Sequence, residues 1–167
     1  NFDGQVPTRV RGAELRLVKP VARLIATTES APSALIQGSR SADLTAPVVW
    51  IGPGADPRNY EGKDVKGKIV LMDSEVPMQA ADTDVFRKWR PYSFHQYKLE
   101  NAVNHGAKAM IYNYGPIVNP NNSYREGFVY HHVGPAVVSD VFAGTGRTYA
   151  ETVGRIRKEL KPQSFAT

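Results

Sequence analysis

The spacing of apolar residues in the first third of the chain predicts short β-strands separated by turns. Apolar and polar side chains alternate from Glu14 to Leu17, which is typical of a strand with one exposed face. Pro20 interrupts the apolar pattern that follows, so this region forms either two strands or one strand with a kink at a sheet edge. Residues 48–51, VVWI, predict a short buried strand that ends at the following Gly-Pro-Gly sequence.

A strand–helix–strand unit is predicted in the middle of the chain. Residues 64–68 form a tight turn, and the four apolar residues at 69–72 indicate a strand that is covered on both faces. After a helix, AKAMIYN at residues 107–113 predicts a second strand. Because a helix separates the two strands, we expect them to lie parallel in one sheet. The polar stretch at residues 73–91 is too long for a routine connection, so it is either functional or mobile.

The helix of this unit has recognisable start and stop signals. Ser93 and Gln96 have the spacing of a capping box, in which each side chain satisfies a backbone N–H of the other residue. Gly106 stands where a left-handed C-terminal cap is expected. The apolar stripe between these signals consists of Leu99, Ala102 and Val103.

The last part of the chain is predicted to hold one more strand, a helix and a tail. Residues 136–139, AVVS, predict a short strand, and Pro162 ends the helix that follows. Glu151 and Arg155 have the spacing of an i,i+4 ion pair on the outer face of this helix. Residues 163–167 are expected to be a frayed tail or a join to another segment. The apolar positions of the helix, at helical spacing, are Tyr149, Val153, Ile156 and Leu160.

Composition indicates the class of protein but does not indicate a particular function. The 167 residues are 41% hydrophobic and 22% charged, which is ordinary for one soluble globular domain. The chain has no cysteine, which excludes disulfides and thiolate zinc sites. No apolar run approaches the roughly 18 residues that span a bilayer, so we expect no membrane span. Because the chain begins at Asn1 without a charged-then-apolar leader, we expect a processed protein or an excised domain.

The net charge of +5 does not by itself predict a nucleic-acid partner. The 21 basic residues are interleaved with 16 acidic ones, and no block of five or more like charges occurs. The densest patch, RKWRPY at residues 87–92, mixes cations with aromatic rings as single-strand binders do. The simpler interpretation is a solvated loop with one packed tryptophan, and we therefore expect no nucleic-acid binding.

The glycine-containing motifs do not predict a phosphate site. The Gly67-Lys68 pair lacks the upstream glycine and the following Ser or Thr of a nucleotide-binding loop, and it precedes a strand rather than a helix. Gly144 and Gly146 do precede a helix, but the third glycine of a dinucleotide-binding motif is missing. Both motifs are interpreted as turns.

The four histidines do not form a recognisable metal site. His95 and His105 lie about 15 Å apart along one helix, so they cannot share a metal ion. His131 and His132 are neighbours in an extended segment, where their side chains point to opposite faces. No zinc motif and no Gly-x-Ser-x-Gly nucleophile motif is present either. We therefore expect neither a catalytic residue nor a metal ion in this chain.

The ordered set of motifs resembles the protease-associated (PA) domain. SRSADLTAPVVWIGPG at residues 39–54 looks specifically like PA domains that are inserted in di-zinc aminopeptidases and glutamate carboxypeptidase-like metallopeptidases. The resemblance covers residues 13–160, nearly the whole chain. The other motifs that carry it are YEGKDVKGKIVLMD at residues 60–73, Lys98 with Ala102 and Gly106, AMIYN at residues 109–113, and GPAVVS at residues 134–139 before a terminal helix.

The resemblance implies both a fold and a kind of function. The implied fold is α/β and β-rich, a PA-type β-sandwich or open barrel with flanking helices, of the swivelling β/β/α type. It implies a single domain over residues 1–167, with its core at about residues 13–160, excised from a larger metallopeptidase. Such a domain is not an enzyme itself; it modulates substrate access or mediates protein and peptide contacts.

The resemblance also implies partners and a location. The partners are the catalytic peptidase domain of the parent chain and a peptide or protein substrate. Zinc belongs to the parent's catalytic domain, and this chain needs no cofactor. The location is secreted, periplasmic or lumenal. An alternative of a different class is a free-standing protein-binding or sorting module without an attached protease, and an autonomous hydrolase is a third possibility that the missing catalytic motifs disfavour.

The stretch between the first strand and the helix of the central unit departs from the family pattern. Many PA domains carry Arg-Gly and Cys there, and this chain has neither. Trp89, Arg90 and Tyr92 in this stretch are the candidate binding residues, because exposed aromatic and arginine side chains are favoured as interface anchors. The alternative is that Trp89 and Tyr92 pack against the domain and hold the loop in place.

Overall fold

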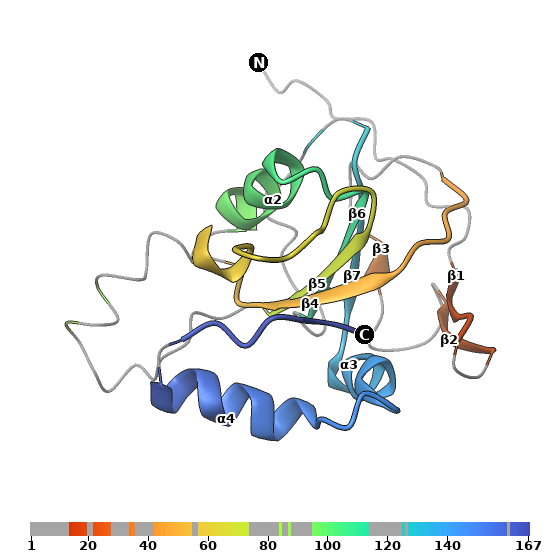
Figure 1. Ribbon diagram of the computed structural model, residues 1–167. Coiled ribbons are helices and arrows are strands. Elements are labelled where there is room, and N and C mark those ends of the chain that lie inside the picture. Colours follow the sequence, from red (N-terminus) through yellow and green to blue (C-terminus); the bar gives the residue numbers. More distant parts are fainter. Residues whose placement is uncertain are drawn as a thin grey trace, which may run out of the picture.

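The central feature of the fold is a mixed β-sheet with helices on both faces, accompanied by a separate two-stranded hairpin (Figure 1). The α/β class with flanking helices that was inferred from the sequence is therefore confirmed. The computed structural model describes residues 14–19, 22–27, 34–35, 42–54, 57–73, 84, 87, 95–113, 125, 127–159 and 161–167.

The central sheet has six strands in the order β3-β7-β6-β5-β4-β8. The inner strands β4 to β7 run parallel to one another. The short edge strands β3 and β8 pair antiparallel with β7 and β4. The bounds are β3 Ala34–Leu35, β4 Val48–Gly52, β5 Ile69–Asp73, β6 Ala109–Asn113, β7 Val129–Val133 and β8 Phe165–Ala166.

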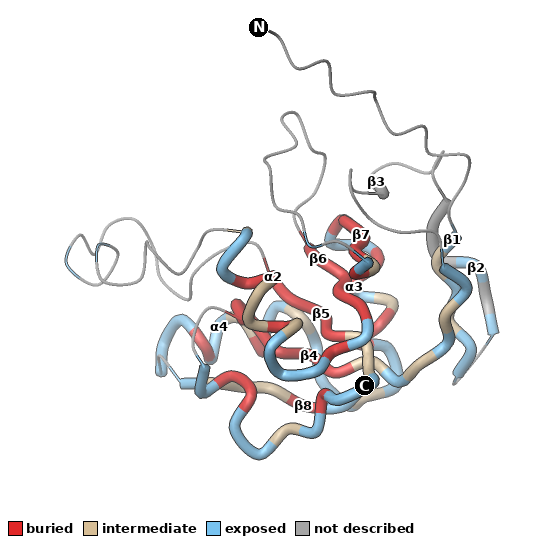
Figure 2. The backbone as a smooth tube through the Cα atoms, turned by 90° about the horizontal axis from the view of Figure 1, so that it is seen from above, coloured by how far each residue is buried: buried red, intermediate tan, exposed pale blue. Residues whose placement is uncertain are grey.

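Burial on both faces explains why the inner segments are strands. β6 is buried at every position and β5 at all but its first, which agrees with the apolar runs in their sequences (Figure 2). Successive side chains point to opposite faces of a strand. Met72 accordingly packs with Leu99 in the cluster on one face, and Leu71 packs with Ile156 in the cluster on the other.

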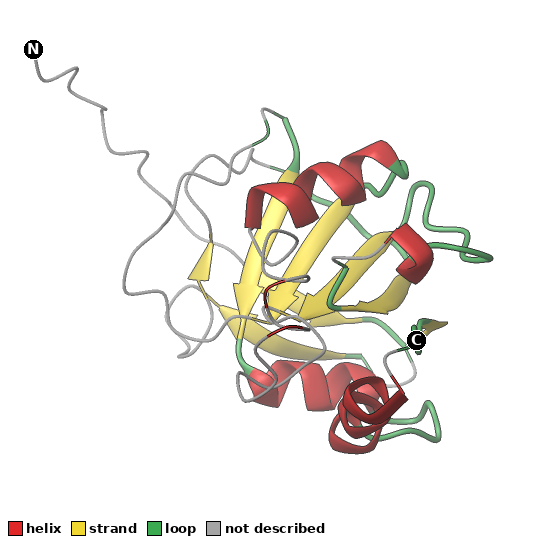
Figure 3. Cartoon of the chain, turned by 90° about the vertical axis from the view of Figure 1, so that its left-hand side faces the viewer, coloured by secondary structure: helices red, strands yellow, loops and turns green. Residues whose placement is uncertain are grey.

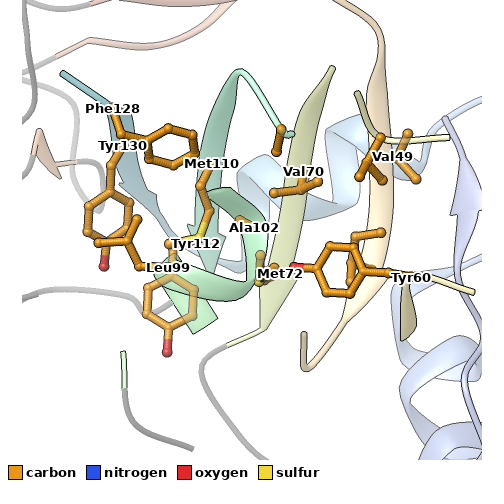
Figure 4. Packing of buried hydrophobic residues seen from close by; sticks show 13 residues of the cluster. Val49, Tyr60, Val70, Met72, Leu99, Ala102, Met110, Tyr112, Phe128 and Tyr130 are labelled. Carbon is orange, nitrogen blue, oxygen red and sulfur yellow. Dashed lines mark hydrogen bonds between the residues drawn. The ribbon is translucent and has the colours of Figure 1, made fainter. Parts of the chain in front are cut away.

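Within the described residues, three α-helices cover the two faces of the sheet. Helix α2 (His95–Asn104) lies on one face, and helices α3 (Pro135–Phe142) and α4 (Tyr149–Glu159) lie on the other (Figure 3). Ala102 of α2 is fully buried, and its small side chain lets the helix approach the sheet closely. Figure 4 shows this face, on which Leu99 and Ala102 lie over Met72, Met110 and Tyr112.

The predicted strand–helix–strand unit is confirmed. β5 and β6 pair in parallel over their whole length. In the turn before β5, Gly67 has a φ of 72° and donates its N–H to the carbonyl of Gly106 at 2.9 Å. Lys68 forms an ion pair with Asp64 at 3.1 Å, so the Gly-Lys pair is a turn as predicted. Ser93 of the expected capping box lies outside the described residues.

The first and the last of the described segments both form strands. β1 (Glu14–Leu17) and β2 (Arg23–Thr27) pair antiparallel, which decides between the two alternatives for this region, and exposure alternates along β1 as predicted. The expectation of a frayed tail is wrong, because β8 pairs with β4 and the buried Phe165 packs in the α3 and α4 cluster. The burial of this one aromatic ring explains why the tail is ordered.

The segment predicted as a strand at residues 136–139 is a helix instead. Gly134 is the extended N-cap residue and Pro135 occupies the first turn of α3. Proline suits this place because its fixed φ matches the helix and its missing N–H has no intrahelical partner there. The strand β7 directly precedes α3 in the sequence. For this region the sequence predicted only an extended segment at His131 and His132. The buried side chains of α3 have helical spacing and are Val137, Val138, Val141 and Phe142.

The final helix forms as predicted over Tyr149–Glu159, while its predicted apolar position Leu160 lies outside the described residues. The expected ion pair between Glu151 and Arg155 is not formed. The Nε atom of Arg155 lies 3.5 Å from Glu159 instead. Glu151 takes part in the start of the helix, where its N–H donates to the hydroxyl oxygen of Thr148 at 3.3 Å. The Thr148 hydroxyl in turn donates to the Glu151 carboxylate at 2.6 Å. Capping at the N-terminus therefore replaces the ion pair.

Candidate functional site at the carboxyl ends of the parallel strands

The carboxyl ends of β5, β6 and β7 meet at one edge of the sheet. Asp73 pairs with Asn113, and Asn113 pairs with Val133, each at the end of its strand. In open sheets of parallel strands, ligands bind beyond these carboxyl ends. The stretch that contains Trp89, Arg90 and Tyr92 begins directly after Asp73, but these three residues lie outside the part of the chain that the structure describes.

A hydrogen-bonded network joins β5, β6 and α4 at this edge. The Oδ1 atom of Asp73 accepts hydrogen bonds from the Asn113 side-chain amide at 2.8 Å and from the Tyr149 hydroxyl at 2.9 Å. The Asn113 amide nitrogen also lies 3.0 Å from the Tyr149 hydroxyl oxygen. Asp73 and Asn113 are buried, so the bonds compensate for the loss of water around a carboxylate. The network ties the final helix to the ends of two strands.

Lys98 holds the end of β5 from the other face of the sheet. Its side chain is fully buried, and its Nζ atom donates to the backbone carbonyl of Asp73 at 2.6 Å. The same nitrogen lies 5.5 Å from the centroid of the Tyr112 ring, within the range of a cation–π contact. Asp73 is thus fixed by its side chain from α4 and by its carbonyl from α2.

Two histidines and two tyrosines from three elements pack together beside Lys98; we call these four residues, His95, Tyr112, Tyr130 and His132, the histidine–tyrosine cluster. The ring centroids of His95 and His132 are 6.3 Å apart, and that of Tyr112 is 5.0 Å from His95 and 5.3 Å from His132. The Tyr130 hydroxyl lies 2.7 Å from Nε2 of His132. The cluster joins the start of α2 to β6 and β7.

Burial keeps the imidazoles of the cluster neutral at pH 7. Desolvation, with a smaller effect of the nearby Lys98 ammonium, lowers the pKa of His95 to about 4. Desolvation, followed by the charges of His95 and His131, lowers the pKa of His132 to about 3. Burial also lowers the pKa of His131. These groups are therefore uncharged hydrogen-bonding groups rather than cations near neutral pH.

The histidine arrangement was only partly foreseen from the sequence. His105 lies near the C-terminal end of α2, where it stacks on Tyr60 with 4.0 Å between ring centroids, so it is far from the cluster. The pairing of His95 with His132 joins residues distant in sequence, and no motif spacing could signal it. Within the described ranges, no group of three or more His, Cys, Asp or Glu side chains is placed to hold a metal ion.

The comparison with family models decides the family. Residues 28–143, well over half of the chain, match the model of the PA domain. This chain belongs to the PA domain family. The turn and strand at DVKGKIVLMD, the close approach of α2 at Ala102 and the reversal at Gly106 are thus elements of a PA domain. None of the helices that the structure describes in this PA domain is long and apolar enough to cross a membrane.

Solved structures with a similar fold include two bacterial aminopeptidases. The aminopeptidase from Aneurinibacillus sp. strain AM-1 is 20% identical over 84% of this chain and 29% of its own length, with a TM-score of 0.49. A zinc aminopeptidase from Bacillus subtilis is 19% identical over 81% of this chain and 29% of its own length, with a TM-score of 0.50. This PA domain thus spans less than a third of either enzyme. No curated protein matches the chain.

Proposed function

We propose that this chain is the non-catalytic PA domain of a larger zinc aminopeptidase. The observation that carries the proposal is the match of residues 28–143 to the PA domain. The likeness in fold to 29% of the zinc aminopeptidase from Bacillus subtilis supports a parent enzyme of that kind. In this proposal residues 1–167 form one domain, zinc lies in the parent's catalytic domain, and the parent is secreted, periplasmic or lumenal.

The chemistry at the carboxyl edge, where the carboxyl ends of β5, β6 and β7 meet, supports a structural role for the charged groups there. A general base or nucleophile must reach a substrate atom, whereas the Asp73 carboxylate is buried and accepts hydrogen bonds from Asn113 and Tyr149. The Lys98 ammonium is fully buried against the Asp73 carbonyl. These groups hold the ends of the strands, which favours a domain that recognises or positions other molecules.

The proposed contact surface is the stretch that leaves this edge. It begins after Asp73 at the end of β5 and ends at His95, where α2 starts. We propose Trp89, Arg90 and Tyr92 as its contact residues, because aromatic and arginine side chains are enriched among residues that dominate binding energy. Their partners are the catalytic domain of the parent chain and the peptide or protein substrate, whose access the domain modulates.

Replacing Trp89 by alanine tests this surface. In the protein that carries this domain, Trp89→Ala is expected to raise KM for a long peptide about fivefold to tenfold, the effect of losing one interface anchor of about 1 kcal/mol or more. The turnover of leucine p-nitroanilide, a substrate with a single amino-acid residue, is expected to stay unchanged. The two substrates are compared by steady-state kinetics.

Tyr97→Ala is the matched control. Tyr97 is an exposed aromatic residue on α2, outside the proposed surface. Its replacement is expected to leave KM for both substrates unchanged. If Trp89→Ala instead lowers the unfolding midpoint while the kinetics with the long peptide stay as in the wild type, Trp89 packs against the domain and the contact surface is wrong.

A further inference from the structure

Two histidines that lie far apart in sequence pack against each other and against the same tyrosine at the carboxyl ends of the parallel strands. His95 is the first residue of α2, and His132 lies in β7. Their ring centroids are 6.3 Å apart, with an angle of 32° between the ring planes. Tyr112 of β6 contacts both rings. The contact is therefore a direct link between the first turn of a helix and a strand of the sheet.

The described groups around these two rings are cationic, phenolic or apolar. On α2, Lys98 places its ammonium over the ring of Tyr112. On β7, the hydroxyl of Tyr130 lies 2.7 Å from Nε2 of His132. His131 precedes His132 in the same strand, so its side chain points to the opposite face.

Among the residues that the structure describes, the remaining elements packed here add no acidic side chain on the same face. On β5, Asp73 directs its carboxylate to the opposite face, where it bonds to Tyr149 of α4. On β3, Ala34 is the residue opposite His132. Protonation of either ring would thus place a new positive charge in a buried site, next to a second imidazole and close to the Lys98 ammonium.

We propose that the contact between His95 and His132 is an acid-sensitive switch, which holds the first turn of α2 against β7 at neutral pH and releases it on acidification. The opened state exposes the first turn of α2, which begins at His95. The switch rests on residues of the domain itself, so it holds whether or not the domain belongs to a peptidase. The released element is the start of α2, while the strands β4 and β5 stay in place.

The sign of the pH dependence follows from the two lowered pKa values. An exposed histidine binds a proton as the pH falls through about 6.5. In the closed state the pKa is about 4 for His95 and about 3 for His132. Between the pKa of an exposed histidine, about 6.5, and these lower closed-state values, only the opened or unfolded state takes up the proton. The closed state therefore loses stability relative to the opened state as the pH falls below about 6.5. Above that pH the stability is fully present.

Chemical denaturation of the full chain at pH 7 and pH 5 measures the effect. The unfolding equilibrium constant of the wild type is expected to rise on the order of 100-fold between these pH values, because each histidine contributes up to tenfold per pH unit. His132 is expected to account for about 20-fold of this rise in the unfolding equilibrium constant. His95 contributes less, because solvent reaches its half-buried ring and screens its charge. His132→Gln is expected to remove that 20-fold share.

His105→Gln is the matched control, because His105 is an exposed histidine directly after the C-terminal end of α2, at the opposite end of this helix from the cluster. It is expected to keep the pH dependence of the wild type. Equal pH dependence in His132→Gln and the wild type would overturn the proposal.

Two measurements on the wild type need no variant. In NMR titrations, the ring signals of His95 and His132 in the closed state are expected to stay unprotonated down to pH 5; titration of these rings near pH 6.5 without any loss of the exchange protection of α2 and β7 overturns the proposal. In hydrogen exchange corrected for intrinsic rates, acidification is expected to speed exchange in α2 and β7 more than in β4. A uniform increase over all strands contradicts a local switch.

Discussion

Replacing Gly54 by alanine is expected to destabilise the domain by about 3 kcal/mol, which combines backbone strain with overpacking. Gly54 has a φ of 60°, and a Cβ atom there would lie 2.2 Å from the Sδ atom of Met72. Met72 is fully buried on β5, so its side chain has little room to move. The loss is measured as the change in free energy of unfolding by urea denaturation.

Gly67→Ala separates the two causes. Gly67 has a similar φ of 72°, but a Cβ atom there would have no neighbour within 4 Å. The expected loss is therefore only the strain of a left-handed backbone, about 1–2 kcal/mol. If both variants lose the same free energy, the packing of Met72 against the Gly-Pro-Gly turn is not as tight as the structure indicates.

Removing the Tyr149 hydroxyl is expected to cost about 2 kcal/mol, the usual contribution of a hydrogen bond to a charged group. The hydroxyl donates to the buried carboxylate of Asp73 at 2.9 Å. Tyr149→Phe keeps the ring, which packs edge-on against Trp50 and Phe142. The loss therefore reports on the network at the carboxyl edge, and urea denaturation measures it.

A double-mutant cycle supplies the control for this prediction. In a chain that already carries Asp73→Ala, the carboxylate acceptor is gone, so Tyr149→Phe is expected to cost less than about 0.5 kcal/mol. An equal cost in both backgrounds means that the hydroxyl acts through something other than Asp73, and the description of the network fails.

The central unit of the fold could be predicted because its signals are local. The apolar runs of β5 and β6 and the glycine after α2 each specify one element within a few residues. α3 was missed because its valine pair favours a strand, and only Pro135 together with the buried Phe142 shows the helical pattern. β7 was missed as a buried strand because His131 and His132 are polar by type, although both are buried here.

The polar network could have been found from the sequence, whereas the histidine–tyrosine cluster could not. Asp73 and Asn113 each end an apolar run, and parallel pairing of the two strands places them side by side. The contact of His95 with His132 depends on how α2 lies on the sheet, which local pattern does not encode. The candidate contact residues Trp89, Arg90 and Tyr92 stay a prediction.

The most direct test of the central claim compares two proteins in one assay. The isolated chain and the full-length product of its gene are each incubated with leucine p-nitroanilide and zinc. The proposed function predicts turnover by the full-length product, with its loss on chelation of zinc, and no turnover by residues 1–167 alone. Turnover by the isolated chain, or a full-length product without aminopeptidase activity, would contradict the assignment as a non-catalytic domain of a zinc aminopeptidase.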